Sequence, residues 1–445
     1  MTCRAFILAT AMLVAMPAFA TPACAASAKI KAGISAEDWG TTQKGEKVKL
    51  YTLTGKGGMV ARITNFGGVV VDLIVPDRHG KPVNVVLGYD DFASYEKGGV
   101  YSALIGRYAN RLSFKFPVDG KIYEQPAPPP RPAGAGVPPQ SPRPYIQHGG
   151  SNGFQKRVWE AVAHDGPEPS LALTIKEADG TGGFPGNITV TVTYTVRADN
   201  TLVLDYKGTT DKPTVMNLTN HFYFNLNGGI RDINDERLTL FSRRYTPFDA
   251  NAMPTGVIAP VAGTPYDFTK PVRMGDRLAL PDVAQTVADG VRIPGYDTSL
   301  LTDGVVGQLR PAARLEGPDT GIVMVTLTTQ PGLELYTDNI NTQVKGRKGA
   351  LYGNHWAISL ETQRAADTPN HPNFTSAEVT PERPLHEVTE YRFSTMKRRA
   401  TARLKPCRTS RRYSPRSSVP SGTTLRHGGR SLPIAAEAAD FRRRC

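Results

Sequence analysis

Ile188-Thr189-Val190-Thr191-Val192-Thr193-Tyr194-Thr195-Val196 alternates apolar residues with threonine at every step. Successive side chains of a β-strand point to opposite faces, so this stretch predicts a strand with one apolar face and one threonine face. Asp199-Asn200 then marks a turn, after which Leu202, Leu204 and Tyr206 resume the alternation. The sequence therefore predicts an antiparallel hairpin with one apolar face on each strand.

The same period of two recurs along the chain. Val323, Val325 and Leu327 alternate before the turn at Pro331-Gly332, and Leu333 and Leu335 alternate after it. No helical stripe exceeds about three turns, and no repeat of roughly 20–50 residues is found. The chain has 445 residues with 43 Gly and 36 Pro, a content that suits many short strands and turns. We predict an all-β protein, a large antiparallel β-sandwich with few short helices.

The first 28 residues are typical of an export signal. Arg4 precedes the apolar run 5–15, and Ala18-Phe19-Ala20 and Ala23-Cys24-Ala25 both offer cleavage sites near residues 20–28. A buried N-terminal helix is the alternative interpretation. The chain has four cysteines: Cys3, Cys24, Cys407 and Cys445. The body between them has none, so we expect a bacterial periplasmic protein without a core disulfide and with no membrane span after signal removal.

Most of the positive charge lies at the C-terminal end. The net charge is +13, yet residues 397–445 contain 14 Lys or Arg and 2 Asp or Glu, which leaves only +1 for the rest. A nearly neutral body shows no basic face for nucleic acid, so we expect no nucleic-acid partner. The tail 397–445 is rich in Arg, Ser and Pro and predicts disorder. A solvated extension and an arm for anionic surfaces are the two interpretations.

One segment interrupts the strand pattern. Residues 126–144 contain nine prolines in nineteen residues. Such a run is typical of a polyproline-like or irregular surface loop. We interpret it as an insertion in a domain that spans residues 29–396, with partner binding as the alternative.

Three places carry residues suited to chemistry. In the stretch 215–226, His221 shares a polar face whose reverse is apolar. In 355–363, Trp356, Ile358 and Leu360 share one face, which leaves Glu361 on the other. The third place is His148, which precedes a glycine turn.

Each of these residues alone has a structural alternative, a core histidine or a salt-bridge partner. Together they suggest an imidazole and a carboxylate that transfer protons on opposite sides of a small substrate. The eight His form no close HxH or HxxxH pair, and no glycine-rich phosphate loop precedes a helix. We therefore expect no metal and no cofactor.

Several motifs in order then point to a family. They are Val75-Pro76-Asp77-Arg78, 86–90 (VLGYD), 106–111 (GRYANR), His148-Gly149-Gly150, 217–221 (NLTNH), 329–332 (TQPG) and 360–363 (LETQ). Over about residues 38–394 the chain resembles the aldose 1-epimerase, or galactose mutarotase, family. The resemblance implies a single large β-sandwich of the galactose mutarotase type. It also implies interconversion of the α and β anomers of aldohexoses such as galactose and glucose, without a cofactor.

The resemblance also implies residue roles. Glu361 is the expected base and His221 the expected acid, with His148 on the ring-oxygen side of the sugar. The residues expected to bind the sugar are Arg111, Asn110, His148, Asp297 and Gln330. The proline-rich run replaces the short link that usually precedes the HGG motif, so the placement of His148 stays open at this stage.

Other functions remain as alternatives. A non-catalytic carbohydrate-binding sandwich would bind sugar without turnover. A tail-driven binder of nucleic acid would show steep salt dependence. A sugar-phosphate epimerase would need a basic cluster, whereas the motifs supply only Arg111. The expected partner is thus an aldohexose, and the protein is expected to be a monomer or a homodimer.

Overall fold

The alternating stretch 188–196 forms the first strand of the predicted hairpin. In the computed structural model, β13 (Ile188–Val196) pairs antiparallel with β14 (Thr201–Thr210), with Val192 opposite Tyr206. The structure describes residues 30–126, 145–280, 283, 286–288, 291–340 and 343–396. The predicted signal segment, the proline-rich run after Pro126 and the basic tail lie outside these residues.

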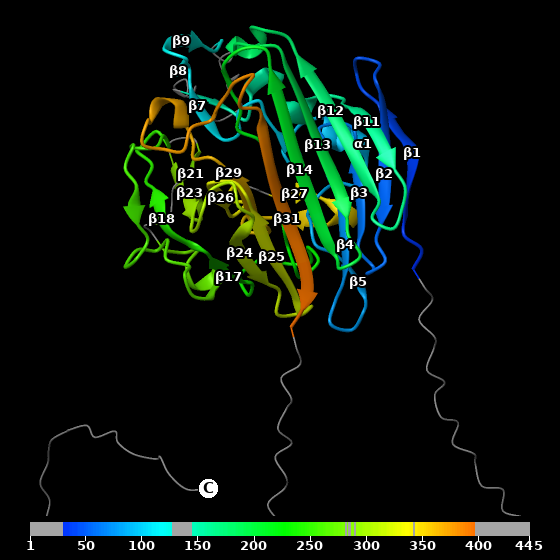
Figure 1. Cartoon of the computed structure of the whole chain (residues 1–445). Coiled ribbons are helices and arrows are strands. Elements are labelled where there is room, and N and C mark those ends of the chain that lie inside the picture. The colour runs from blue at the N-terminus through cyan, green and yellow to red at the C-terminus, as the bar shows by residue number, and fades with distance from the viewer. Residues whose placement is uncertain are drawn as a thin grey trace, which may run out of the picture. The chain divides into compact units, whose positions relative to one another are not determined.

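The hairpin belongs to the largest sheet, which has nine strands (Figure 1). In spatial order the strands are β11 (Glu160–His164), β12 (Ser170–Glu177), β13, β14, β31 (Leu385–Thr395), β25 (Ile322–Thr328), β24 (Arg310–Glu316), β17 (Arg237–Leu240) and β20 (Val272–Arg273). The long strand β31 lies in the middle of this sheet, so the last strand of the chain is bonded on both sides. All strand pairings in the nine-stranded sheet are antiparallel, as predicted.

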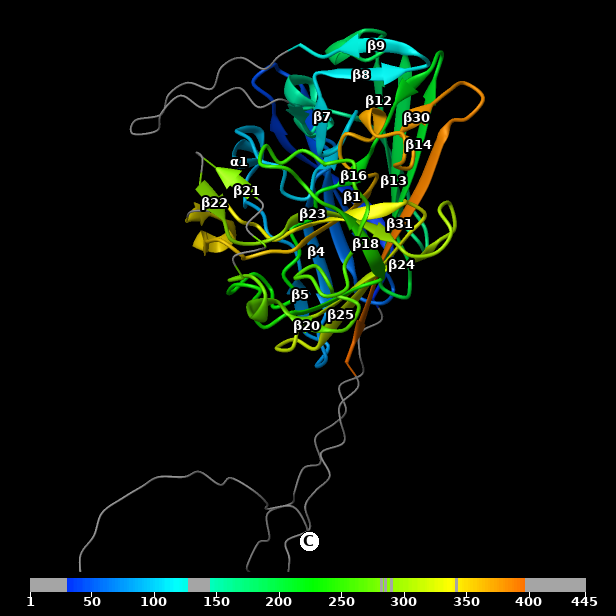
Figure 2. The same ribbon diagram turned by 90° about the vertical axis from the view of Figure 1, so that its left-hand side faces the viewer.

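Two five-stranded sheets complete the main layers. One consists of β1 (Gly33–Thr41), β2 (Lys47–Thr54), β3 (Val60–Thr64), β4 (Val70–Pro76) and β5 (Pro82–Asn84). The other consists of β19 (Ala259–Pro260), β18 (Ser242–Thr246), β23 (Asp297–Thr302), β26 (Gly332–Tyr336) and β29 (Ser359–Gln363). Figure 2 shows β18 and β23 toward the viewer and the β8–β9 hairpin at the upper end. The second of these sheets carries the site described below.

Short elements connect the sheets. The two-stranded pairs are β6 (Leu104–Ile105) with β16 (Thr219–Asn220), β7 (Arg111–Ser113) with β10 (Tyr145–Gln147), β8 (Lys115–Val118) with β9 (Lys121–Glu124), β15 (Thr214–Val215) with β30 (Glu378–Val379), β21 (Thr286–Ala288) with β22 (Val291–Ile293), and β27 (Val344–Lys345) with β28 (Leu351–Tyr352). The one α-helix in the described part of the chain is α1 (Phe92–Glu96), which Asp91 caps by accepting from the N–H of Ser94. Single 3-10 turns occur at 150–152, 154–156, 181–183, 274–276, 347–349 and 368–370.

One apolar core joins all three sheets. It contains Leu53 from the first five-stranded sheet, Val192 and Leu204 from the large sheet, and Leu333 and Leu360 from the second five-stranded sheet. Burial of this apolar surface is the main force that stabilises the layers. The predicted all-β sandwich with few short helices is confirmed.

Strand β25 differs from the expected pattern in its buried face. Its fully buried side chains include Ile322, Met324 and Thr326, whereas Val325 and Leu327 are only half-buried. Thr326 and Thr328 face inward instead. Thr328 contacts the hydroxyl of Thr389, whereas Thr326 Oγ1 has no hydrogen-bond partner among the described residues. The face with Val325 and Leu327 is therefore the less buried face of β25.

The stretch 215–226 is not one continuous strand. Only β15 and β16 form regular pairs within it, because its backbone groups bond to several different segments. The N–H of His221 donates to the carbonyl of Ala103, and the N–H of Phe224 donates to the carbonyl of Ile358. The segment is therefore buried on both sides, and its predicted polar face is an interior face.

Candidate active site

The site lies on one face of the sheet formed by β23, β26 and β29. Strand register places Asp297, Tyr336 and Ser359 in one row across the three strands. A second row, two residues along, consists of Ser299, Glu334 and Glu361. Side chains in such rows share one face, so six polar groups are gathered there. The rows between them, which contain Leu335 and Leu360, face the core.

His221 contacts two members of this face. Its Nε2 lies 3.3 Å from Glu361 Oε1, and its Nδ1 lies 3.3 Å from the hydroxyl oxygen of Ser359. Ser359 and Glu361 are two residues apart on β29, so their side chains point the same way and reach both nitrogens of one ring. The contact between His221 and Glu361 thus joins the two residues expected to transfer protons.

Burial determines the charge of this pair. His221 and Glu361 are 4% and 1% exposed. Burial lowers the pKa of His221 to about 4. Burial, reinforced by the nearby carboxyls of Glu334 and Asp297, raises the pKa of Glu361 well above its ordinary value. Both shifts favour the neutral forms, so the two groups together hold one proton.

Each nitrogen of the His221 ring has its own neighbour. Nε2 faces Glu361 Oε1, and Nδ1 contacts the Ser359 hydroxyl, where the imidazole tautomer decides which group donates. Transfer of a proton from Glu361 to Nε2 would produce a carboxylate and an imidazolium without any change in total charge. A Ser359 hydroxyl that accepts from Nδ1–H leaves Nε2 to exchange that proton with Glu361.

His148 lies beside His221. The two rings are 5.3 Å apart between centroids and meet edge to face. The N–H of Asn110 donates to His148 Nδ1 at 3.3 Å, and the His148 N–H donates to the Asn110 carbonyl at 2.9 Å. His148 has a positive φ of 53°, which turns the chain sharply before Gly149. The proline-rich run before it does not separate His148 from His221.

Arg111 and Asp297 form a buried ion pair next to these histidines. Arg111 Nη2 donates to Asp297 Oδ2 at 2.6 Å, and Arg111 Nη1 donates to Asn110 Oδ1 at 2.9 Å. Burial opposes the charge on Arg111, but the carboxylate of Asp297 outweighs it and raises the pKa of Arg111 above its ordinary value. The guanidinium also lies over the rings of Tyr145 and Phe248. Three expected sugar-binding residues are thus joined in one network.

Aromatic residues pack around the imidazole of His221. The Tyr223 ring stacks on it at a centroid distance of 5.0 Å and an interplanar angle of 13°. Tyr336 meets it edge to face at 5.9 Å. Tyr336 is half-buried and Tyr223 is nearly buried. Aromatic rings supply the flat apolar surfaces on which a sugar ring can lie while polar groups fix its orientation.

Gln330 makes a different set of contacts. Its Nε2 donates to the carbonyl of Leu218 at 3.4 Å, and its Oε1 accepts from Arg364 Nη1 at 3.2 Å. Arg364 in turn binds Glu387. The side chain is 1% exposed, and both ends of its amide are engaged by the segments on either side of the site. These contacts suit a role in joining the segments that carry His221 and Glu361.

Glu334 is the site residue that sequence reasoning missed. It lies directly opposite Glu361 and is 1% exposed. A signal was available, because Glu334 stands between Leu333 and Leu335, and alternation puts it on the face opposite to these leucines. A carboxyl on such a buried strand is costly unless partners surround it.

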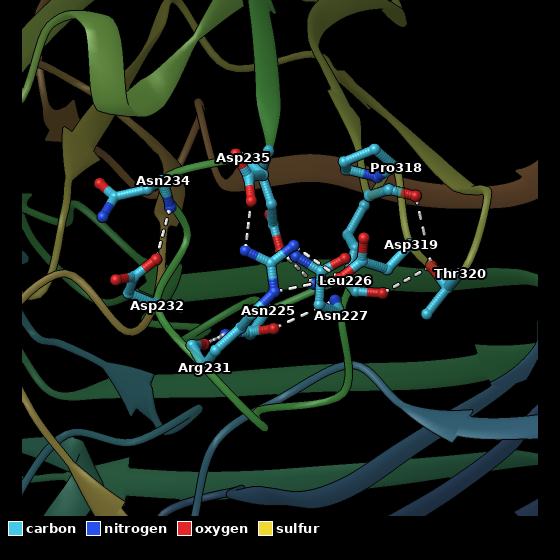
Figure 3. Close-up of polar contacts among 12 residues, drawn as sticks. Asn225, Leu226, Asn227, Arg231, Asp232, Asn234, Asp235, Pro318, Asp319 and Thr320 are labelled. Carbon is cyan, nitrogen blue, oxygen red and sulfur yellow. Dashed lines mark hydrogen bonds and ion pairs between the residues drawn. The ribbon is translucent and has the colours of Figure 1, made fainter.

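The far end of the His221 segment is anchored by a polar network (Figure 3). Arg231 Nη2 lies 2.6 Å from Asp319 Oδ2, and Arg231 Nη1 binds Asp235. The amide of Asn225 donates to the carbonyl of Arg231, and Thr320 donates to the carbonyl of Leu226. These contacts hold Asn225 and Leu226, the C-terminal end of the segment that carries His221.

The described residues include neither a metal-holding cluster nor a membrane-spanning helix. Among residues 30–126 and the later described ranges, no three or more His, Cys, Asp or Glu are arranged to hold a metal ion. In the same part of the chain, no helix has the length and apolar character needed to cross a membrane.

Comparison with known proteins gives concordant matches. Residues 49–392 match the family described as Aldose 1-epimerase. The galactose mutarotase of Rattus norvegicus is 35% identical over 337 residues, which are 75% of this chain and 90% of that protein. The aldose 1-epimerase of Escherichia coli (strain K12) is 29% identical over 355 residues, 78% of this chain and 96% of that protein.

Solved structures show the same fold. An aldose epimerase homologue from C. elegans superposes with a TM-score of 0.66 and 28% identity, covering 77% of this chain and 98% of that one. A galactose 1-epimerase from Lactobacillus acidophilus superposes with a TM-score of 0.68 and 23% identity, covering 82% of this chain and all of that one. The sheets and their order therefore belong to a known architecture.

Proposed function

The chain belongs to the aldose 1-epimerase family and is a mutarotase, an isomerase of aldoses, and we propose that Glu361 is its base and His221 its acid. The observation that carries this proposal is the 3.3 Å contact between Glu361 Oε1 and His221 Nε2, two groups that are both buried. A reaction that removes one proton and delivers another needs such a pair.

The proposed reaction begins when the shared proton lies on His221. Glu361 removes the proton of the C1 hydroxyl, and the electron pair of that O–H forms the carbonyl. The bond from C1 to the ring oxygen breaks, and His221 Nε2–H gives its proton to that oxygen. The products are the open-chain aldehyde, a protonated Glu361 and a neutral His221, so protons and charge balance.

Closure of the ring repeats these steps in reverse. Rotation about the C1–C2 bond presents the other face of the aldehyde to the C5 hydroxyl. His221 takes the proton of that hydroxyl as its oxygen attacks C1, and Glu361 returns a proton to the carbonyl oxygen. The site regains its initial protonation state, and the product is the opposite anomer.

The remaining residues are proposed to position the sugar. Arg111, Asn110 and Asp297 offer charged and amide groups to the hydroxyls that do not react, and His148 offers its ring near the ring oxygen. Restraint of the substrate in one orientation reduces the entropy lost in the transition state. Gln330 is a weaker candidate for this role, since both ends of its amide already have partners.

Polarimetry on freshly dissolved α-galactose and α-glucose tests the proposal. Added protein is expected to accelerate the change in optical rotation above the spontaneous rate for aldohexoses. The Glu361→Gln variant is the matched control, since it keeps the shape of the side chain. A non-catalytic sugar-binding sandwich would bind galactose in calorimetry but leave the rate unchanged for both proteins, which would exclude the assignment.

We also propose that the protein is exported to the periplasm. Support comes from Arg4, the apolar run 5–15 and the small residues before residue 28. The intact mass of protein from a periplasmic extract is expected to show a start between Thr21 and Lys29. Full-length protein beginning at Met1 and confined to the cytoplasm would contradict export.

A further inference from the structure

Two carboxyls beside the catalytic pair are in direct contact. The side chains of Glu334 and Asp297 are within hydrogen-bond reach of each other, on neighbouring strands β26 and β23. Two ionised carboxylates at such a distance repel strongly in a buried site. One of them therefore carries a proton, and the contacts of each show which one it is.

The contacts favour a proton on Glu334. Asp297 accepts the charged hydrogen bond of the Arg111 guanidinium at 2.6 Å. No cation in the described part of the chain donates a hydrogen bond to Glu334, and its Oε2 accepts from the neutral hydroxyl of Ser299. Its Oε1 is buried and receives no hydrogen bond from any donor in the described part of the chain. A proton on Oε1 turns that unsatisfied acceptor into a donor toward Asp297.

The charges around Glu334 lead to the same result. Asp297 faces it from β23, Glu361 from β29, and Arg111 from β7. The carboxyls of Asp297, Glu334 and Glu361 thus lie near one guanidinium, that of Arg111. Asp297 already neutralises the charge of Arg111. Burial and the charge of Asp297 raise the pKa of Glu334 well above its ordinary value. If Glu334 were ionised, its charge would keep the shared proton on Glu361 and prevent Glu361 from acting as a base.

We propose that Glu334 is a positioning residue that works in its protonated form. Its O–H donates to Asp297 and so fixes the Asp297–Arg111 pair that holds the sugar, while its lack of charge lets Glu361 become a carboxylate. This inference rests on the proposed function of Glu361 and His221. Glu334 itself acts through Asp297 and Glu361.

Two substitutions separate the protonated from the ionised form. In Glu334→Gln the amide N–H replaces the carboxyl O–H toward Asp297 and the amide oxygen still accepts from Ser299. In Glu334→Leu both hydrogen bonds are lost. Loss of a hydrogen bond to a charged group weakens binding by about ten- to a hundredfold. KM for galactose should therefore rise by that factor in Glu334→Leu. In Glu334→Gln, KM should rise by less than about threefold.

Glu236→Gln is the matched control. Glu236 is also a fully buried carboxyl with a raised pKa, but it accepts from the N–H of Leu226 and does not contact the site residues described above. The control is expected to keep kcat and KM. If Glu334→Gln and Glu334→Leu raised KM equally, the ionised form would be the working one, and the proposal would be overturned.

Infrared spectroscopy gives a second readout that needs no turnover. The wild-type protein at neutral pH should show the C=O stretch of a protonated carboxyl that disappears in Glu334→Gln, in addition to the band lost in Glu236→Gln. Absence of that loss would overturn the proposal even if Glu334→Leu failed to fold. A wild-type protein that accelerated no anomer exchange would instead contradict the proposed function, and the infrared band would still report on Glu334.

Discussion

Glu361 Oε1 lies 3.3 Å from Nε2 of His221, and no water-exposed surface separates the two groups, because both side chains are almost fully buried. In water such a pair would be a carboxylate and a partly protonated imidazole. Burial instead favours one shared proton, which is the condition that acid–base ring opening needs.

Glu361→Gln and His221→Asn should each lower kcat by about 10²–10⁴-fold, the usual contribution of an acid or base in the transition state. KM should change much less, since Arg111 and Asp297 remain. The double variant should lose less than the product of the single losses, because both groups serve one proton transfer. The polarimetric rate, corrected for the spontaneous rate, measures this. A Glu361→Gln protein with more than about a tenth of wild-type kcat would show that Glu361 is not the base.

Ser359→Ala should lower kcat by about five- to tenfold, because a neutral hydrogen bond contributes about 1 kcal/mol. The variant removes the acceptor for His221 Nδ1–H, so the ring can turn or carry its proton on the wrong nitrogen. Ser359→Thr retains the hydroxyl and serves as the control. Equal kcat values for the alanine variant and the wild type would mean that Glu361 alone orients the ring.

Arg111→Ala should raise KM and also destabilise the fold. Removal of one partner of a buried ion pair leaves the carboxylate of Asp297 without its cation, which costs about 3–5 kcal/mol in the free energy of unfolding. The double variant Arg111→Ala with Asp297→Ala should recover part of that stability without recovering KM. Urea denaturation and polarimetry check the two effects separately. If the double variant were less stable than Arg111→Ala, the pair would not be the cause.

The activity should fall on the acid side only near pH 4. The pKa of His221 is lowered to about 4, so above that pH the His221–Glu361 pair holds a single proton. Below it both groups are protonated, and no base remains. On the alkaline side the pair loses its one proton above the raised pKa of Glu361, and the acid is lost. The measurement is kcat/KM against pH, and an acid limb near the ordinary histidine pKa of about 6.5 would contradict this assignment.

Glu236 should make stability depend on pH. Burial raises its pKa to about 8 from an ordinary value of 4.5, so the folded protein holds a proton that the unfolded chain releases above pH 4.5. The free energy of unfolding therefore falls as pH rises from 4.5 to about 8, by at most about 5 kcal/mol. Glu236→Gln cannot ionise and still accepts from the Leu226 N–H, so it should be more stable than the wild type near pH 8 and similar near pH 4.5.

Denaturation midpoints at several pH values test this prediction. Glu316→Gln, a change in a half-buried carboxyl that binds Arg314, is the control and should follow the wild-type curve. Parallel curves for Glu236→Gln and the wild type would contradict the raised pKa.

The local sequence pattern was enough to predict the strands and to place part of the candidate site. The threonine alternation of 188–196 predicted β13 and its partner, since the period of two is a property of the extended backbone itself. The apolar residues Ile358 and Leu360 likewise placed Glu361 on the face opposite the core. Family motifs supplied the role of His221. For β25, the apolar alternation did not identify the more buried face, because packing against β24 and β31 turned Thr326 and Thr328 inward.

The relations across the sheet were decided by the tertiary structure. Sequence placed Leu333 and Leu335 on one face of a strand, yet it did not say which strand would lie beside them. Register then set Glu334 directly opposite Glu361 and next to Asp297, and only that neighbourhood makes its protonation matter. A side chain's face follows from the local backbone period, whereas its charge state follows from which distant charges fold against it and exclude water.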